Sequence, residues 1–165
     1  MLASFGLYYI VLNVLRAHTI AFPDRARHAD EKASLLDHLR PGGVAVLNAD
    51  DPLVRAMAAR VRGRVVLFGT APDADVQAAG AAARWPERLA FDLHTRDGAA
   101  FRARTCLVGD HWCTATTAAL ATAHALGVPL PGAVAALTRV EPFPSRLQPV
   151  LLPGGAVVLR DDYDG

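Results

Sequence analysis

The sequence is poor in cysteine, in lysine and in net charge, and each shortage argues against a class of protein. Only two cysteines, Cys106 and Cys113, occur in 165 residues, and their spacing is not that of a metal site, which favours the reducing cytoplasm. A formal net charge of +1 leaves nothing that would hold a nucleic acid or an anionic membrane by electrostatics. Sixteen of the seventeen basic residues are arginines, and they are scattered along the sequence.

Long hydrophobic runs are also missing. The apolar segment 2–15 is shorter than the ~20 residues that span a bilayer. It lacks the basic region and the cleavage site of a signal peptide, so we expect a buried strand there and no membrane insertion. A chain of 165 residues provides for one domain with a proper core.

Apolar runs and helical patterns alternate in the first part of the chain. We expect strands at 8–14, 44–47 and 64–68, with helices at 23–39 and 52–61 between them. The apolar stripe of the first helix is expected at Leu35, Leu36 and Leu39. Strands that alternate with helices predict an α/β fold with a mostly parallel sheet flanked by helices.

The pattern changes in the second part, where hairpin signals appear. Runs at 89–94 and 101–107 flank Asp97-Gly98, which predicts an antiparallel hairpin. An alanine-rich helix is expected at 111–126 and a short one at 131–137. A second hairpin is expected at 148–159 around Gly154-Gly155. The predicted fold therefore includes a small antiparallel hairpin portion.

A cluster of polar residues follows the strand at 44–47. Asn48, Asp50 and Asp51 stand at its carboxyl end, where open α/β sheets place their ligands. The alternative for the two carboxylates is that they cap the helix that begins at Pro52. The sequence leaves both interpretations open.

Other candidate residues lie near the ends of predicted elements. Asn13 and His18 follow the first strand, and Lys32 lies on the next helix, although each alone is more typical of a loop or a solvated face. Gly109-Asp110-His111 begins the alanine-rich helix and suits an anion, with Asp110 as an ordinary N-cap as the alternative. Arg146, Asp161 and Tyr163 come last, and the fork of Arg146 suits a phosphate or carboxylate.

Taken in order, these motifs resemble the central domain of the Mur ligases. They are Val11-Leu12-Asn13-Val14, His18, Lys32, Gly43-Val44-Ala45-Val46-Leu47-Asn48-Ala49-Asp50-Asp51, Leu67-Phe68-Gly69, Gly109-Asp110-His111, Ala125-Leu126-Gly127-Val128, Arg146 and Asp161-Asp162-Tyr163-Asp164. The resemblance implies a fold like that of the P-loop NTPases. Ala17-His18 followed by Phe22 looks more like the branch that adds D-alanyl-D-alanine.

The resemblance also implies an ATP-dependent, ADP-forming amide-bond ligase of peptidoglycan precursor synthesis, which acts through an acyl phosphate in the cytoplasm. Its partners would be a UDP-linked muramoyl peptide and an amino acid or dipeptide. By position, His18 matches a Mg²⁺ ligand, and Lys32 matches a lysine that many members carbamylate and that then holds the metal. Asn48, His111, Arg146, Asp161 and Tyr163 match the wall that binds ATP.

Several positions depart from the family pattern. No Gly-x-x-x-x-Gly-Lys-Ser/Thr loop occurs, Trp112 and Ala115 stand where asparagines are usual, and Ser145 replaces a glycine. Trp112 could stack on the base or pack against the sheet. We therefore expect residues 1–165 to be an incomplete central domain, without phosphate loop or C-terminal domain, and a fragment inactive alone. The alternatives are a non-catalytic nucleotide-binding or interaction module, or another Mur-type ligase of the polyglutamate or cyanophycin type.

Overall fold

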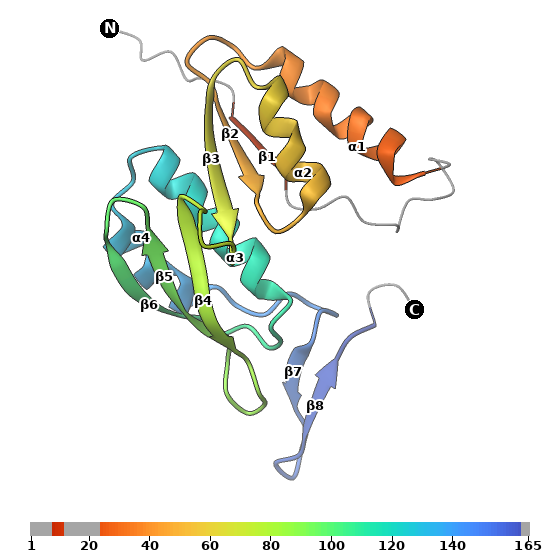
Figure 1. The fold of residues 1–165 in the computed structure, drawn as a ribbon. Helices are drawn as coiled ribbons and strands as arrows, with labels where there is room; N and C mark the ends of the chain where they lie inside the picture. The colour runs from red at the N-terminus through yellow and green to blue at the C-terminus, as the bar shows by residue number, and fades with distance from the viewer. Residues whose placement is uncertain (1–7, 12–23, 163–165) are drawn as a thin grey trace, which may run out of the picture.

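The computed structural model describes residues 8–11 and 24–162, and its main element is a sheet of six strands that follow one another in chain order (Figure 1). The strands are β1 (Tyr8–Val11), β2 (Val44–Asn48), β3 (Arg64–Gly69), β4 (Val76–Ala82), β5 (Ala90–Thr95) and β6 (Ala100–Arg104). Pairs from β1 to β4 are parallel, whereas β4–β5 and β5–β6 are antiparallel. The predicted α/β class with a mostly parallel sheet at the start of the chain is confirmed.

Helices cover both faces of the sheet (Figure 1). They are α1 (Arg25–Ser34), α2 (Pro52–Ala56), α3 (Trp112–Ala125) and α4 (Leu130–Ala136), with 3₁₀ turns at Leu35–His38, Met57–Arg60 and Leu137–Arg139. The buried β2 serves two cores at once. Val44 and Val46 pack with α3, and Ala45 and Leu47 pack with α1 and α2. This confirms that the second strand is covered on both faces, as its continuous apolar run predicts.

The first helix differs from its prediction in length and in its buried face. Asp24 caps α1 by accepting a hydrogen bond from the Arg27 amide at 2.7 Å, but the α-helix ends at Ser34 and a 3₁₀ turn follows. The tighter turn changes which side chains face the core. Leu36 is buried and Leu39 half-buried, but Leu35 is 49% exposed, so its place in the apolar stripe was wrongly predicted.

Strand β4 is absent from the predicted pattern. Its sequence is rich in alanine and glycine, which favour strands poorly, so the run gave no strand signal. It pairs with β3 only at Phe68–Val76 and Gly69–Gln77, so the short segment 70–75 suffices to connect the two. Through β4, the predicted hairpin of β5 and β6 joins the main sheet and is no separate unit. The predicted first strand ends at Val11 in the structure, and residues 12–14 lie outside the described ranges.

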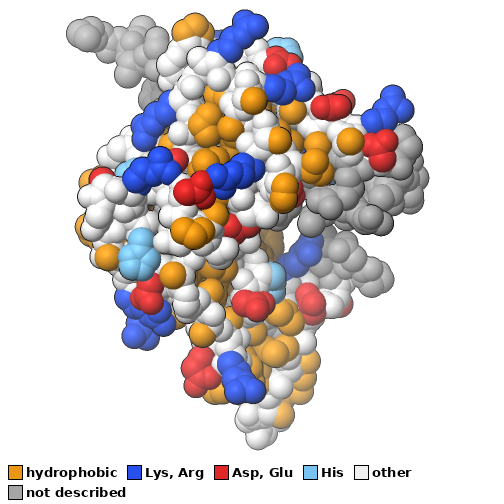
Figure 2. Space-filling view, in the orientation of Figure 1, with side chains coloured by type: hydrophobic (Ala, Val, Ile, Leu, Met, Phe, Trp, Pro, Cys, Tyr) orange, Lys and Arg blue, Asp and Glu red, His pale blue; other side chains and the backbone are white. Residues whose placement is uncertain are grey.

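A second predicted hairpin, β7 (Gln148–Leu151) with β8 (Val157–Arg160), forms a sheet of its own (Figure 1). The apolar side chains of β8 are exposed, and Leu151 at the end of β7 is 72% exposed. Figure 2 shows the hydrophobic side chains gathered on this lower part of the molecule. Within the described residues, no helix is both long enough and apolar enough to cross a membrane.

Candidate functional site

The end of β2 is tied to the end of β3 by the carboxylate of Asp50. The Asn48 side chain is buried, and its Oδ1 accepts a hydrogen bond from the Asp50 amide at 2.9 Å. The Asp50 carboxylate in turn accepts hydrogen bonds from the amides of Thr70 at 2.8 Å and Ala71 at 2.9 Å. Backbone amides on a carboxylate form strong, charge-assisted hydrogen bonds, so the two strand ends are held in one arrangement.

Gly69 is required where these strand ends meet. Its φ is +144°, and a Cβ built on it would lie 2.7 Å from the Asp50 carboxyl group. Any side chain at this position would push Asp50 away from the amides that it binds. The Leu67-Phe68-Gly69 motif therefore has a packing reason in this chain.

Asp51 performs the capping role that the sequence left open for both carboxylates. Its Oδ1 accepts hydrogen bonds from the amides of Leu53 at 2.9 Å and Val54 at 3.4 Å, at the start of α2. Asp50 does not take part in the cap. Asp51 therefore caps a helix, and Asp50 links the ends of two strands.

The start of α3 lies beside this strand-end cluster, because α3 packs on β2 and β3. Burial raises the pKa of the Cys113 thiol above its ordinary value, and the carboxylates of Asp50 and Asp110 raise it further. Both groups therefore lie close enough to Cys113 to disfavour its thiolate. The carboxyl end of β2 and the amino end of α3 thus form one polar region.

His111, and not Asp110, occupies the N-cap of α3, and its side chain makes no cap hydrogen bond. The prediction that Asp110 is the cap is wrong, because the helix begins one residue later than that role requires. The His111 ring is exposed and lies 5.3 Å from the Trp112 ring, centre to centre. Trp112 packs against the core, which is one of the two alternatives predicted for it. Its buried Nε1 has no hydrogen-bond partner among the described residues.

The segment around Arg146 reaches the same region. A Cβ on Gly109 would lie 2.6 Å from the His111 ring and 3.0 Å from Leu147 Cδ1, so the loop before α3 touches the residue after Arg146. The amide of Leu147 donates to Asp161 Oδ1 at 3.3 Å. His111, Arg146 and Asp161, far apart in the sequence, are therefore brought into one neighbourhood.

Arg146 lies between two residues in the left-handed region of backbone conformation. The φ of Ser145 is 62° and that of Leu147 is 48°, values that residues with side chains adopt rarely. Ser145 thus keeps a conformation suited to the glycine that the family pattern leads one to expect. A hydrogen bond from Ser145 and the neighbouring Arg160 hold the pKa of Asp162 below its usual range. The two ends of the hairpin are joined at this point.

Lys32 lies half-buried in the last turn of α1, and its predicted role as a metal ligand stays a prediction. Asn13, His18 and Tyr163 lie outside the described residues, so their predicted roles stay predictions. In the ranges 8–11 and 24–162 no three His, Cys, Asp or Glu side chains are grouped to hold a metal ion.

Sequence reasoning missed the backbone amides of Thr70 and Ala71, because a main-chain donor has no residue-type signal. The only trace in the sequence is Gly69 directly after an apolar run, which is typical of a close approach of two segments.

Residues 7–123 match the family of the Mur ligase middle domain, and the chain belongs to this family. It is 36% identical over 153 residues to the UDP-N-acetylmuramoyl-tripeptide–D-alanyl-D-alanine ligase of Mycobacterium bovis, a match that covers 93% of this chain and 30% of that protein. It is 37% identical over 131 residues to the UDP-N-acetylmuramate–L-alanine ligase of Halorhodospira halophila, covering 78% of this chain and 27% of that one.

Among solved structures, MurF from Acinetobacter baumannii superposes with a TM-score of 0.83 at 26% identity. The superposition covers 96% of this chain and 34% of MurF. The chain therefore spans about a third or less of the length of these relatives.

Proposed function

We propose that this chain is the central domain of an ATP-dependent, ADP-forming amide-bond ligase of peptidoglycan precursor synthesis. Its substrates would be a UDP-linked muramoyl peptide and an amino acid or dipeptide, with D-alanyl-D-alanine as the first choice. Membership in the Mur ligase family and the activities for which its relatives are named support this proposal. The low cysteine content of the chain favours a reducing compartment, and we propose a cytoplasmic location.

The observation that carries the proposal is the convergence of Asn48, His111, Arg146 and Asp161 at one edge of the sheet. Separate segments that meet at the carboxyl ends of parallel strands are typical of a ligand site in open α/β folds. We assign these residues, with Tyr163, to the nucleotide. Arg146 would bind phosphate oxygens through its planar fork, and the exposed ring of His111 would lie at the edge of the bound nucleotide.

The proposed reaction begins with transfer of a phosphoryl group to a substrate carboxylate, followed by attack of an amine on the acyl phosphate. Positive charge near the transferred group stabilises such a transition state, and Arg146 is the described residue suited to this. Mg²⁺ would add to that charge when bound. In the part of the chain that the structure describes, no three His, Cys, Asp or Glu side chains are grouped to hold the ion, and we propose His18 and a carbamylated Lys32 as its ligands.

We further propose that residues 1–165 act as part of a longer ligase and are inactive alone. The relatives are about three times as long, and the exposed apolar hairpin is the kind of surface that an adjoining part of such a protein covers. The alternative of a non-catalytic nucleotide-binding module is favoured by Trp112, which packs against the core where the family has a polar residue. The polyglutamate and cyanophycin types stay open as alternatives.

The test is ADP formation by the product of the complete gene, given ATP, Mg²⁺ and either UDP-muramoyl tripeptide with D-alanyl-D-alanine or UDP-N-acetylmuramate with L-alanine. We expect turnover with the first pair. Arg146→Ala should lower the rate by a factor of about 10² to 10³, as loss of one charged contact to a transition state does. Arg62→Ala, which removes an exposed arginine between the second 3₁₀ turn and β3, is the control and should leave the rate unchanged.

Two results would contradict the proposal. Nucleotide binding without ADP formation from any of these acceptors would support the non-catalytic module instead. Equal rates for the Arg146 and Arg62 variants would show that Arg146 does not belong to the site. Calorimetry on the 165-residue chain with ATP and Mg²⁺ tests the incomplete-domain proposal separately, and micromolar binding would contradict it.

A further inference from the structure

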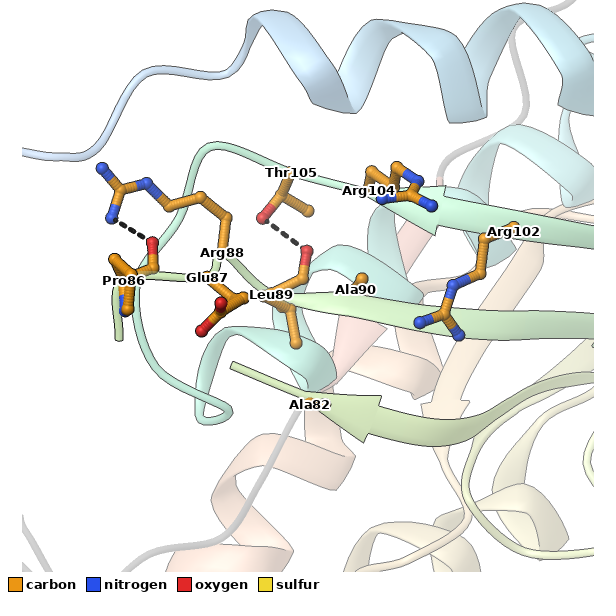
Figure 3. A pocket seen from close by; sticks show the side chains of 9 residues that line it. All are labelled: Ala82, Pro86, Glu87, Arg88, Leu89, Ala90, Arg102, Arg104 and Thr105. Atoms are coloured by element: carbon orange, nitrogen blue, oxygen red, sulfur yellow. Dashed lines mark hydrogen bonds between the residues drawn. The ribbon is translucent and has the colours of Figure 1, made fainter. Parts of the chain in front are cut away.

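The antiparallel part of the sheet carries a hollow of about 480 Å³ that none of the proposed site residues lines (Figure 3). Ala82 at the end of β4 and Ala90 at the start of β5 lie along it, and their small side chains leave the space open. Three arginines surround it. Figure 3 shows Arg88 in the loop before β5, and Arg102 and Arg104 on β6.

The charge of this hollow is unbalanced in favour of cations. Arg102 donates to Asp92 at 3.0 Å, but no carboxylate among the described residues pairs with Arg88 or Arg104. Glu87 is the one acidic residue of its lining within the described chain. By contrast, Arg55 and Arg60 elsewhere on the surface are each paired with an aspartate. The hollow therefore keeps guanidinium groups available for a ligand.

Part of the rim is held in place before any ligand arrives. The Arg88 guanidinium lies 4.7 Å from the centre of the Trp85 ring and donates to the Pro86 carbonyl at 3.5 Å. The Thr105 hydroxyl donates to the Leu89 carbonyl at 3.1 Å, which joins the end of β6 to the loop before β5. A side chain that is already ordered loses less conformational entropy on binding.

Arg102 and Arg104 point the same way because they are two residues apart on one strand. Alternate residues of a strand share a face, and Ala103 between them is buried in the core on the opposite face. Arg102 and Arg104 therefore lie on one face of β6, whereas the Arg88 side chain extends from the loop before β5 toward the Pro86 carbonyl (Figure 3). A planar guanidinium binds carboxylate and phosphate oxygens in pairs.

We propose that this hollow binds a small anion with two or more phosphate or carboxylate groups. Its volume lies in the range of small-molecule sites, ~300–1,000 Å³. Arg102 and Arg104 would contact oxygens of the ligand, and Arg88, which Trp85 keeps in position, would add positive charge at the rim. The site is separate from the proposed nucleotide site, whose residues lie at the carboxyl ends of β2 and β3.

The test is a titration of the ¹⁵N-labelled 165-residue chain with inorganic pyrophosphate and, separately, with citrate, followed by amide NMR at physiological salt. We expect saturable shifts at Ala82, Ala90 and Thr105 with at least one of the two anions. Binding by pyrophosphate alone assigns phosphate groups to the ligand, and binding by citrate alone assigns carboxylates. The double variant Arg88→Ala/Arg104→Ala should weaken binding by about tenfold or more.

Arg62→Ala/Arg139→Ala removes two exposed arginines elsewhere and should leave the affinity unchanged. Glu87→Gln keeps the size of the side chain and should strengthen binding, which tests the charge argument without removing an arginine. The proposal is overturned if neither anion gives saturable shifts, or if both double variants weaken binding equally. It is also overturned if the shifts appear only at Asp50 and His111, a result that would leave the proposed function intact.

Discussion

Strands β2 and β8 have similar sequences and opposite surroundings. β2 reads Val-Ala-Val-Leu-Asn and all five residues are buried, whereas β8 reads Val-Val-Leu-Arg and all four are exposed. β2 lies between two parallel neighbours with helices on both faces, while β8 has only β7 beside it. An apolar, β-branched run thus marks a strand in both regions, but cover on both faces, which such a run also predicts, is found only for β2.

The same comparison separates the well-packed six-stranded sheet from the exposed hairpin of β7 and β8. A lone two-stranded hairpin is at best marginally stable in water. At the base of the hairpin of β7 and β8 the Leu147 amide donates to Asp161, and Asp161 and the adjacent Arg146 are both assigned to the proposed nucleotide site. The hairpin is therefore the part in which ligand binding and local order should be coupled.

The largest difference in stability is expected between two variants that replace a leucine by alanine, one in β2 and one in β7. Leu47→Ala in the fully buried β2 should lower the free energy of unfolding by about 2–5 kcal/mol, because it leaves a cavity between the sheet and α1. Leu151→Ala, at the exposed end of β7, should change it by less than about 0.5 kcal/mol. Urea unfolding of both variants measures the contrast, and equal losses would mean that the hairpin is packed after all.

A second contrast uses glycines of positive φ in the two regions. Gly69→Ala and Gly154→Ala both place a side chain on a backbone of positive φ, at a cost of about 1–3 kcal/mol each, but only Gly69 lacks room for a Cβ, whereas no atom lies within 4 Å of the one built on Gly154. Displacing Asp50 from the Thr70 and Ala71 amides should cost about 1–3 kcal/mol more. Unfolding free energies of the two variants give the difference, and equal losses would show that Asp50 moves aside at no cost.

A smaller difference in stability is expected from removing one carboxylate in each region, Asp51 at the start of α2 or Asp161 at the base of the hairpin. Asp51→Ala removes the cap of α2 and should lower the free energy of unfolding by about 1 kcal/mol. Asp161→Ala removes the exposed acceptor at the hairpin base and should leave global stability unchanged within about 0.5 kcal/mol. Denaturant midpoints compare the two, and a loss on Asp161→Ala as large as that on Asp51→Ala would join the hairpin to the cooperative unit.

The smallest effect is a pH response confined to the hairpin. The hydrogen bond from Ser145 holds the pKa of Asp162 below its usual range, so its contribution is present above the ordinary pKa of about 3.9 and is lost as the pH falls through the lower, folded-state value. Amide NMR during acidification should show Leu147 shifting at that step while Val46 does not. Asp162→Asn should abolish the step, and a step that persists in this variant would assign it to another group.

Much of the fold could be predicted because local patterns carry it. Three local patterns each mark an element that the structure contains: the polar residues after 44–47, the Asp97-Gly98 turn and the alanine-rich run before Gly127. β4 could not be predicted, since its alanines form a strand only because β3 and β5 offer pairing partners. For the site, the residue types at Asn48, His111 and Arg146 were visible in the sequence, but the approach of Gly109 to Leu147 was not.

The sequence by itself determined the order of the elements apart from β4, and the family to which the chain belongs, because these depend on residues near one another in the chain. Only the tertiary structure decided that Asp50 ties two strands, that β8 is exposed, and that Arg88, Arg102 and Arg104 line one hollow. Such contacts join residues far apart in sequence, and strand pairing and packing set them, not local preference.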